Sequence, residues 1–201
     1  TLPAQMFGLN LLEASDRILN LVEGPWDAMA LWESLRSAGM DGRGVLGLPG
    51  VGAFKEEWAS VFSDKKTVLM GDSDHPKPPP KNGLAGIKGV KRTACILARC
   101  TDPPDSISYL KWGVDGYDPA LKSGYDIRDF LTESNSMDDR IEKTKRFAVG
   151  EVARTPLHVS RNGGYTALPA GGGTLNTAGN QGISKAEWNY TNHHQTIAIQ
   201  G

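Results

Sequence analysis

The chain of 201 residues has only two cysteines, no long apolar run and almost no net charge. Two cysteines cannot form a disulfide framework or a four-cysteine zinc ribbon. Because no run of about 18 apolar residues occurs, we expect no transmembrane segment, and the first residues do not resemble a signal peptide. A formal net charge of −1 excludes a uniformly basic nucleic-acid coat. Any contact with nucleic acid therefore has to come from a local patch or from metal ions.

The composition is sufficient for one folded domain followed by an additional C-terminal segment. Hydrophobic residues make up 39% of the chain, which excludes disorder throughout. Residues 1–139 hold 15 Lys and Arg against 20 Asp and Glu, whereas residues 140–201 hold 7 against 3. Residues 161–182 contain seven glycines and little apolar surface to offset the entropy of ordering. We predict a catalytic domain over 1–139, followed over 140–201 by a helix and a flexible linker or the start of a further domain.

Short apolar runs alternate with amphipathic stretches along the first part of the chain. Such alternation is typical of a parallel sheet covered by helices on both faces. The fold class expected is therefore α/β, a small parallel sheet flanked by helices with a partly flexible C-terminal extension. The pattern predicts strands over 18–22, 45–48, 67–70 and 107–112, helices over 26–36, 53–62, 89–100, 126–131 and 137–147, and short strands over 155–159 and 196–199.

Acidic residues follow the predicted strands. Glu23 comes directly after the first strand, Asp72 and Asp74 follow the third, and Asp126 and Asp129 follow the fourth after a turn. The carboxyl ends of parallel strands meet at one edge of a sheet, where ligands bind. Carboxylates gathered there repel one another, and a divalent cation removes that conflict. Mg²⁺ is usually held by one or two carboxylates together with substrate phosphates, so the pattern predicts a magnesium site for phosphate chemistry.

Each acid also has a purely structural interpretation. A D-x-D sequence after a strand is commonly a turn, because Asp accepts hydrogen bonds from nearby backbone donors. Asp27 falls in the first turn of a predicted helix, where a carboxylate complements the helix dipole. Taken one at a time, these residues do not decide between the two interpretations.

The acids taken together resemble a known family. Residues 21–28, with Glu23, Gly24, Asp27 and Ala28, resemble the E-G-x-x-D-A motif of the TOPRIM (topoisomerase–primase) domain. Asp72-Ser73-Asp74 resembles its D-x-D motif. Residues 124–129 resemble the K-D-x-N-D/E segment of phage-type primases, and residues 8–10 resemble the lead-in found in that group. The similarity covers roughly residues 5–135 and is greatest to phage and plasmid primases, which are often fused to helicases.

The resemblance implies a TOPRIM fold and a DNA primase, a nucleotidyltransferase of viral DNA replication. Such an enzyme joins ribonucleoside triphosphates into RNA primers on single-stranded DNA, with Mg²⁺ or, as a substitute, Mn²⁺. It further implies a fused or associated helicase, no membrane partner, and a location in the bacterial or virus-infected host cytoplasm. Two features depart from the family pattern. The family usually has glycine soon after D-x-D, whereas here His75, Pro76 and a proline-rich insertion come first, and Tyr125 stands where lysine is frequent. The roles implied are catalysis and metal binding for Glu23, Asp72 and Asp74, metal binding for Asp126, and support for Asp27 and Asp129.

Weaker signals remain open. Lys88, Lys91 and Arg92 share one face of a predicted helix, where they either meet nucleotide or DNA phosphates or form a solvated surface. The glycines of residues 47–52 lack the Gly-Lys-Ser/Thr ending of a P-loop and indicate a turn. Two further groups get a structural interpretation: Cys95 and Cys100 are expected as buried thiols, and Trp26, Trp32 and Trp58 as core or interface residues.

Three alternatives to the primase remain. A TOPRIM nuclease or topoisomerase fragment would cleave a phosphodiester with the same acids. A non-catalytic replisome module would bind nucleic acid or a partner and would not need the acids. A phosphatase with an aspartyl nucleophile is disfavoured, because that chemistry usually places its D-x-D after the first strand, whereas here it follows the third.

Overall fold

The computed structural model describes residues 4–78, 83–113 and 116–149, and beyond them the backbone of three short strands. The parallel strands are β1 (Ile18–Val22), β2 (Arg43–Gly47), β3 (Lys66–Met70) and β4 (Ser106–Leu110). The helices are α1 (Pro25–Ser37), α2 (Ala85–Arg99), α3 (Ile127–Thr132) and α4 (Met137–Val149), with 3₁₀ helices η1 (Leu9–Leu11) and η2 (Glu56–Phe62). The short strands are β5 (Arg154–Pro156), β6 (His158–Val159) and β7 (Tyr165–Thr166).

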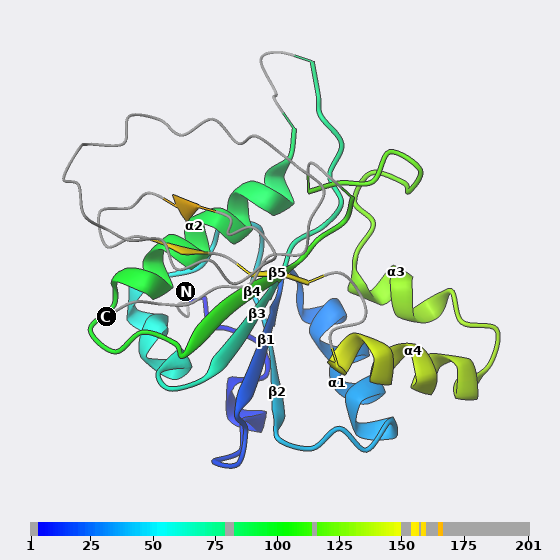
Figure 1. Ribbon diagram of the computed structural model, residues 1–201, viewed down its shortest axis with the longest axis horizontal. Coiled ribbons are helices and arrows are strands. Elements are labelled where there is room, and N and C mark those ends of the chain that lie inside the picture. Colours follow the sequence, from blue (N-terminus) through cyan, green and yellow to red (C-terminus); the bar gives the residue numbers. More distant parts are fainter. Residues whose placement is uncertain are drawn as a thin grey trace, which may run out of the picture.

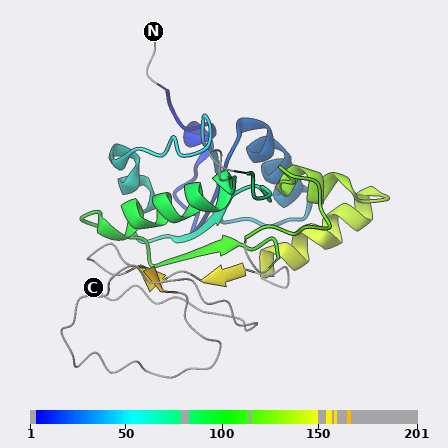
Figure 2. The ribbon, with the colours of Figure 1, turned by 90° about the horizontal axis from the view of Figure 1, so that it is seen from above.

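The centre of the molecule is a five-stranded sheet in the order β2-β1-β3-β4-β5 (Figure 1). The four predicted strands pair in parallel, which confirms the α/β class. The register sets Val22 opposite both Gly47 and Met70, so β1, β2 and β3 end at the same level. The fifth strand, β5, runs antiparallel to β4, as the opposed arrows in Figure 2 show. This strand falls in the region predicted as a strand over 155–159, but its direction was not expected.

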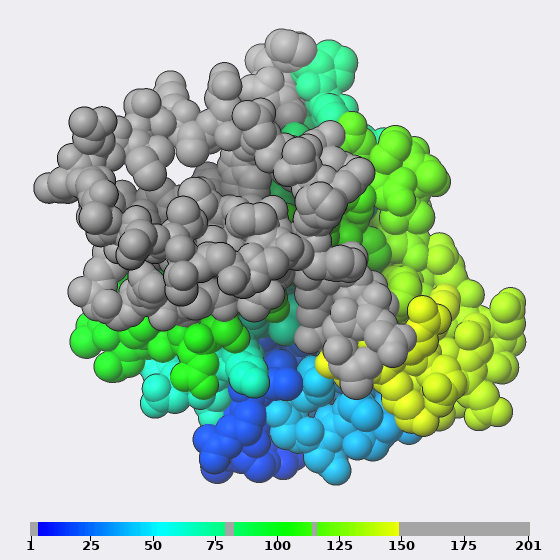
Figure 3. All heavy atoms as spheres, viewed as in Figure 1, coloured from blue at the N-terminus to red at the C-terminus, as the bar shows by residue number. Residues whose placement is uncertain are grey.

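Helices cover both faces of the sheet (Figure 1). On one face, α2 and η2 enclose an apolar core that includes Leu21, Phe62 and Leu97. On the other face, α1, α3 and α4 enclose a second core that includes Leu31 and Phe147. The surface of α4 lies directly against that of α1 (Figure 3), where Arg140 pairs with Glu33 at 3.1 Å. Burying apolar side chains on both faces explains why the strands are continuous apolar runs.

Most predicted elements are found within a few residues of their expected bounds. The exception is the helix predicted over 53–62, which is the shorter 3₁₀ helix η2. Its first residues belong instead to the preceding turn, where the Ala53 N–H donates to the Gly50 carbonyl. The strand predicted over 196–199 and most of the glycine-rich residues 161–182 lie outside the described residues. None of the helices in the described part of the chain is long and apolar enough to cross a membrane.

Candidate active site

The edge formed by the carboxyl ends of β1 and β3 brings Glu23 and Asp72 into contact. Each residue follows its strand almost at once, and the equal level of the two strand ends places them side by side. The backbone N–H of Asp72 donates a hydrogen bond to Glu23 Oε2 at 2.9 Å. The two carboxyl groups also lie within hydrogen-bonding reach of each other. Parallel pairing has thus joined the two acids that the sequence placed after separate strands.

A second acidic pair, Asp27 and Asp126, lies beside the first. Asp27 is on the first turn of α1 and Asp126 caps the N-terminus of α3, and both side chains are buried. Arg128 lies between them, with Nη2 3.0 Å from Asp126 Oδ2 and Nε 3.6 Å from Asp27 Oδ1. Asp129 completes a capping box with Asp126, because each side chain accepts a hydrogen bond from the other's backbone N–H. Asp129 therefore supports the site by fixing the start of α3.

A backbone bridge holds the two halves of the site together. Ser73, between the two aspartates of the D-x-D sequence, pairs antiparallel with Tyr125, the residue before Asp126. The Ser73 N–H donates to the Tyr125 carbonyl at 2.8 Å, and the Gly124 N–H donates to the Ser73 carbonyl at 3.0 Å. Tyr125 is itself buried, and its hydroxyl donates to Glu133 Oε2 at 2.6 Å. The bridge sets Asp126 next to Asp72 although about fifty residues separate them in the chain.

The four carboxyl groups interact electrostatically. Burial, followed by the hydrogen bond and charge of Glu23, raises the pKa of Asp72 to about 9, and the charges of Asp126 and Asp27 add to the effect. Burial and the charge of Asp126 raise the pKa of Asp27 to about 6, although Arg128 opposes the shift. Without a cation, burial and these neighbouring charges therefore favour the protonated form of Asp72. A divalent cation at this edge would favour the deprotonated form of these groups.

Asp74, the second acid of the D-x-D sequence, has a different partner. Its Oδ2 accepts a hydrogen bond from the Gly86 N–H at 2.9 Å, in the first turn of α2. The residue before α2, Leu84, makes no side-chain cap, so Asp74 satisfies a backbone donor that the helix itself leaves open. The charges that raise the pKa of Asp72 are those of Glu23, Asp126 and Asp27. The structure thus groups Glu23, Asp27, Asp72 and Asp126, and directs the Asp74 carboxylate to a helix terminus.

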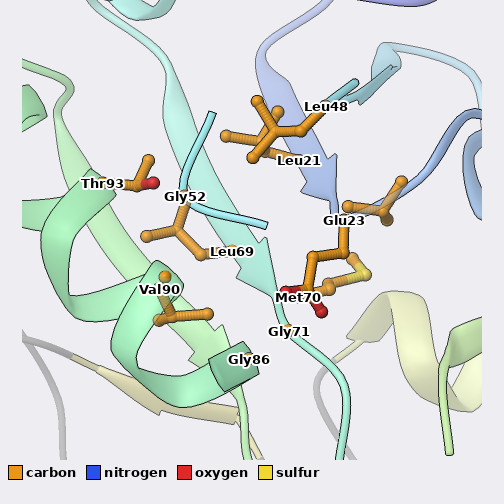
Figure 4. Close-up of a pocket in the computed structure, with 12 residues that line it drawn as sticks. Leu21, Glu23, Leu48, Gly52, Leu69, Met70, Gly71, Gly86, Val90 and Thr93 are labelled. Carbon is orange, nitrogen blue, oxygen red and sulfur yellow. The ribbon is translucent and has the colours of Figure 1, made fainter. Parts of the chain in front are cut away.

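A narrow pocket opens beside Glu23 (Figure 4). Its walls come from β1, β3, α2 and the turn after β2, and Glu23 lies at its rim near the end of β3. Four of its lining residues are glycines, Gly52, Gly71, Gly86 and Gly89, which allow these backbones to approach closely. A Cβ atom on Gly86 would lie 2.6 Å from the backbone nitrogen of Asp72 and closer still to its carbonyl oxygen. Glycine at position 86 is therefore what allows α2 to pack against the D-x-D segment.

We expect Gly86→Ala to lower the free energy of unfolding by about 1–3 kcal/mol and to displace Asp72. The clash is with backbone atoms, which cannot rotate away. Gly89→Ala, on the same helix, is the matched control, because its Cβ would lie 3.3 Å from the Val51 side chain and would reach the Gly52 backbone nitrogen and Glu23 Oε1 only at ordinary contact distances of 3.5 and 3.9 Å. That change gains helix propensity and should leave stability unchanged or slightly raised. Urea denaturation of the two variants checks the pair, and equal stability would contradict the packing described.

The basic residues proposed for phosphate binding lie on α2, the helix that forms one wall of the same pocket. Lys88 and Arg92 are exposed, and Lys91 is half-buried, which lowers its pKa. Lys88 donates to the Gly83 carbonyl at 2.9 Å. A Cβ on Gly52 would lie 3.7 Å from Arg92 Nη1, so the guanidinium covers the turn after β2. Within the described residues, Arg92 has no acidic partner, and it lies one helical turn from the part of α2 that faces Glu23.

Other residues singled out in the sequence take varied positions. Trp58 is buried and Trp32 half-buried, as predicted, but Trp26 is 66% exposed, which excludes the core position and leaves the interface position a prediction. Its place in the first turn of α1, beyond the reach of either core, is the reason. Cys95 and Cys100 are unpaired thiols and are half-buried rather than fully buried. Arg128 is the site residue that sequence reasoning missed, and its position two residues after Asp126 was the available signal.

The carboxylate oxygens at this edge of the sheet can serve as ligands of a metal ion. In the ranges that the structure describes, no three His, Cys, Asp or Glu side chains form a ready-made ligand set. The four carboxylates nevertheless provide the oxygen donors that Mg²⁺ prefers, and Mg²⁺ needs only one or two of them when phosphates and water complete its shell. The buried Asp27 Oδ1 lacks a hydrogen-bond partner, and burial together with the Glu23 carboxyl raises the pKa of Asp72. These features fit a divalent cation held by Glu23 and Asp72.

Comparison with known proteins identifies no relative of this chain. No family model, no curated protein and no solved structure matches this chain. The functional interpretation therefore depends on the geometry of the site and on the motifs in the sequence.

Proposed function

We propose that this chain is the catalytic TOPRIM portion of a DNA primase, which synthesises RNA primers on single-stranded DNA. The observation that carries the proposal is the grouping of Glu23, Asp27, Asp72 and Asp126 at the carboxyl edge of a parallel sheet. The order of the motifs along the chain, with Glu23 after β1 and the D-x-D sequence after β3, supports the resemblance to the TOPRIM family. A fused or associated helicase is the partner that this assignment implies.

In the proposed reaction, the 3′-hydroxyl of the growing primer attacks the α-phosphorus of a ribonucleoside triphosphate and pyrophosphate leaves. Glu23 and Asp72 would hold the divalent cation, with Asp126 and Asp27 adding negative charge behind them. When bound, Mg²⁺ would supply charge neutralisation on the phosphoryl oxygens. Glu23 would also accept the hydroxyl proton, and Arg128, which contacts Asp126 and Asp27, would keep the second acidic pair in place.

Asp74 acts indirectly in this proposal. By capping α2 it fixes the helix that carries Lys88, Lys91 and Arg92 above the site. The same carboxylate would lose that role on binding a cation through Oδ2, so we assign cation binding first to Glu23 and Asp72. Asp74 remains a candidate ligand through its other oxygen.

Primer synthesis and phosphodiester cleavage use the same acids, so one assay has to separate them. The chain is incubated with Mg²⁺ and labelled single-stranded DNA, with and without ribonucleoside triphosphates. A primase gives new RNA products that require the triphosphates and leaves the DNA intact. Shortened DNA without triphosphates would favour the nuclease alternative. No product in either case, combined with tight DNA binding, would favour the non-catalytic module.

Arg92 provides a test of how the triphosphate is held. Losing one charge-assisted hydrogen bond to phosphate should raise KM for the ribonucleoside triphosphate about tenfold in Arg92→Ala, with a smaller change in kcat. Arg99→Ala is the matched control, because Arg99 is an exposed arginine in the last turn of the same helix. Steady-state kinetics of primer synthesis checks both variants. Equal KM values for the two variants would remove Arg92 from the phosphate site.

A further inference from the structure

Trp26 has the largest exposed fraction among the large apolar side chains of the described residues, at 66%. The neighbouring tryptophans differ from it. Trp58 and Trp112 are buried, and Trp32 is half-buried. An indole offers a large flat apolar surface, and a single one left in water at the rim of a candidate active site needs an explanation.

The other described tryptophans have partners that Trp26 lacks. Trp58 packs edge-on against Phe54, and Trp112 donates from Nε1 to the Gly71 carbonyl at 2.8 Å. Arg36 lies over the ring of Trp32. Within the ranges that the structure describes, the ring of Trp26 stacks on no other ring or cation, and its Nε1 has no hydrogen-bond partner. About two thirds of the Trp26 surface is therefore open to a ligand.

The backbone holds Trp26 close to the acidic site. Pro25 occupies the first position of α1, which fixes the direction in which the helix leaves β1. Trp26 follows it and directly precedes Asp27, whose carboxyl group interacts with Asp126 and Glu23. Adjacent Cα atoms are about 3.8 Å apart, and three residues span at most about 11 Å. The backbone of Trp26 therefore lies within that distance of the Cα atoms of Asp27 and Glu23, at the edge of the acidic site.

The apolar strip around Trp26 is short. Met29, three residues along α1, is also exposed, but the stripe ends at Glu33, which pairs with Arg140. A protein partner buries a broad apolar patch with a polar rim, whereas one base needs only one flat ring. The four carboxylates nearby repel phosphates, and stacking on a neutral ring attracts a base without adding to that repulsion.

We propose that Trp26 is a stacking platform for a nucleobase bound at the acidic site. The inference rests on the proposed nucleic-acid function and adds to it a base-binding residue. Stacking of this kind tolerates any base sequence, because every base has a flat aromatic face. The ligand chemistry is shared by a base of single-stranded DNA and by the base of a free ribonucleoside triphosphate, and the experiment treats the two separately.

The test measures binding of a labelled single-stranded oligodeoxynucleotide of about 12 nucleotides by fluorescence anisotropy. Trp26→Ala should weaken binding about 5- to 150-fold, and Trp26→Phe, which keeps a ring, should weaken it less. The ratio between wild type and Trp26→Ala should stay the same as salt rises, because stacking releases no counterions. Met137→Ala is the control, since Met137 is 56% exposed and begins α4, an element that contributes none of the four carboxyl groups of the site. Removing an exposed side chain should leave the melting temperature of each variant near that of wild type.

An abasic oligonucleotide isolates the base itself. Wild type should lose affinity for it by the same factor that Trp26→Ala loses on the normal strand, and Trp26→Ala should lose no more. A matching titration with ATP shows whether the stacked base belongs to the strand or to the incoming nucleotide: a loss of ATP affinity alone assigns it to the nucleotide, and a loss of DNA affinity assigns it to the strand.

The possible failures are distinguishable. If wild type binds neither the oligonucleotide nor ATP, the proposed function and the stacking role both fall. If wild type binds and Trp26→Ala binds equally well, only the stacking role falls. If sedimentation shows that Trp26→Ala dissociates an oligomer of the wild type, the indole is a contact between protein chains and the stacking role is overturned.

Discussion

Replacing Asp72 with Asn should abolish primer synthesis, with a loss of at least about 10³-fold, and leave the fold intact. Asn has nearly the same shape, and the hydrogen bond to Glu23 Oε2 comes from the backbone of residue 72, so it survives the change. The variant loses the anionic oxygen that would bind a cation. Primer synthesis measured with ribonucleoside triphosphates and a single-stranded template checks the loss, and circular dichroism checks the fold.

Asp105→Asn is the matched control for this variant. Asp105 is exposed and precedes β4, at the opposite edge of the sheet. The Asp105→Asn variant therefore loses one carboxylate far from the site. The control should keep full activity. Full activity of Asp72→Asn would end the assignment of this edge as the active site, whereas loss in both variants would point to an effect of net charge.

In the absence of divalent cations, the protein should become less stable as the pH rises from about 5 to 9. The folded-state pKa values of Asp72, about 9, and Asp27, about 6, lie above their ordinary value of 3.8. Between about pH 5 and pH 9 the folded state holds protons that the unfolded chain has released, so the free energy of unfolding falls as the pH rises. We expect the two groups to contribute a decrease of about 1–3 kcal/mol. Urea denaturation in EDTA at pH 6 and pH 8.5 measures it.

Two comparisons assign this pH dependence to the site. Asp72→Asn cannot release a proton at position 72, so its stability should fall less between pH 6 and pH 8.5 and should exceed that of wild type at the higher pH. Adding Mg²⁺ should stabilise wild type more at pH 8.5 than at pH 6, because the cation has to displace the proton. Identical pH dependence of stability in the two proteins would contradict the account. Equal stabilisation of wild type and Asp72→Asn by Mg²⁺ would contradict it as well.

Much of the sheet could be predicted from the sequence. The strands are short apolar runs closed by glycine or acid, and each of the four parallel strands was expected within two residues of its observed start. Because parallel strands end at one edge, the proximity of Glu23 and Asp72 followed from their places after β1 and β3. The start of α1 followed from Pro25, which fits the first position of a helix.

The rest depended on contacts between distant parts of the chain. Asp126 was expected at this edge as an acid after the fourth strand, but the bridge between Ser73 and Tyr125 that sets it next to Asp72 follows from no local pattern. The hydrogen bond from Gly86 to Asp74 joins residues twelve apart across a loop, and it gives one oxygen of an expected cation ligand a role as a helix cap. The exposure of Trp26 depends on where both apolar cores end, which periodicity along one helix does not show.

A crystal of this chain soaked in Mn²⁺ would test the central claim most directly. Mn²⁺ prefers the same oxygen ligands as Mg²⁺, and its anomalous scattering identifies it without ambiguity. The account predicts an anomalous peak within coordination distance of the Glu23 and Asp72 carboxylates. An empty acidic edge in crystals grown at pH 8 or above, where the site is most ready to lose its proton, would contradict the claim that these carboxylates form a cation site.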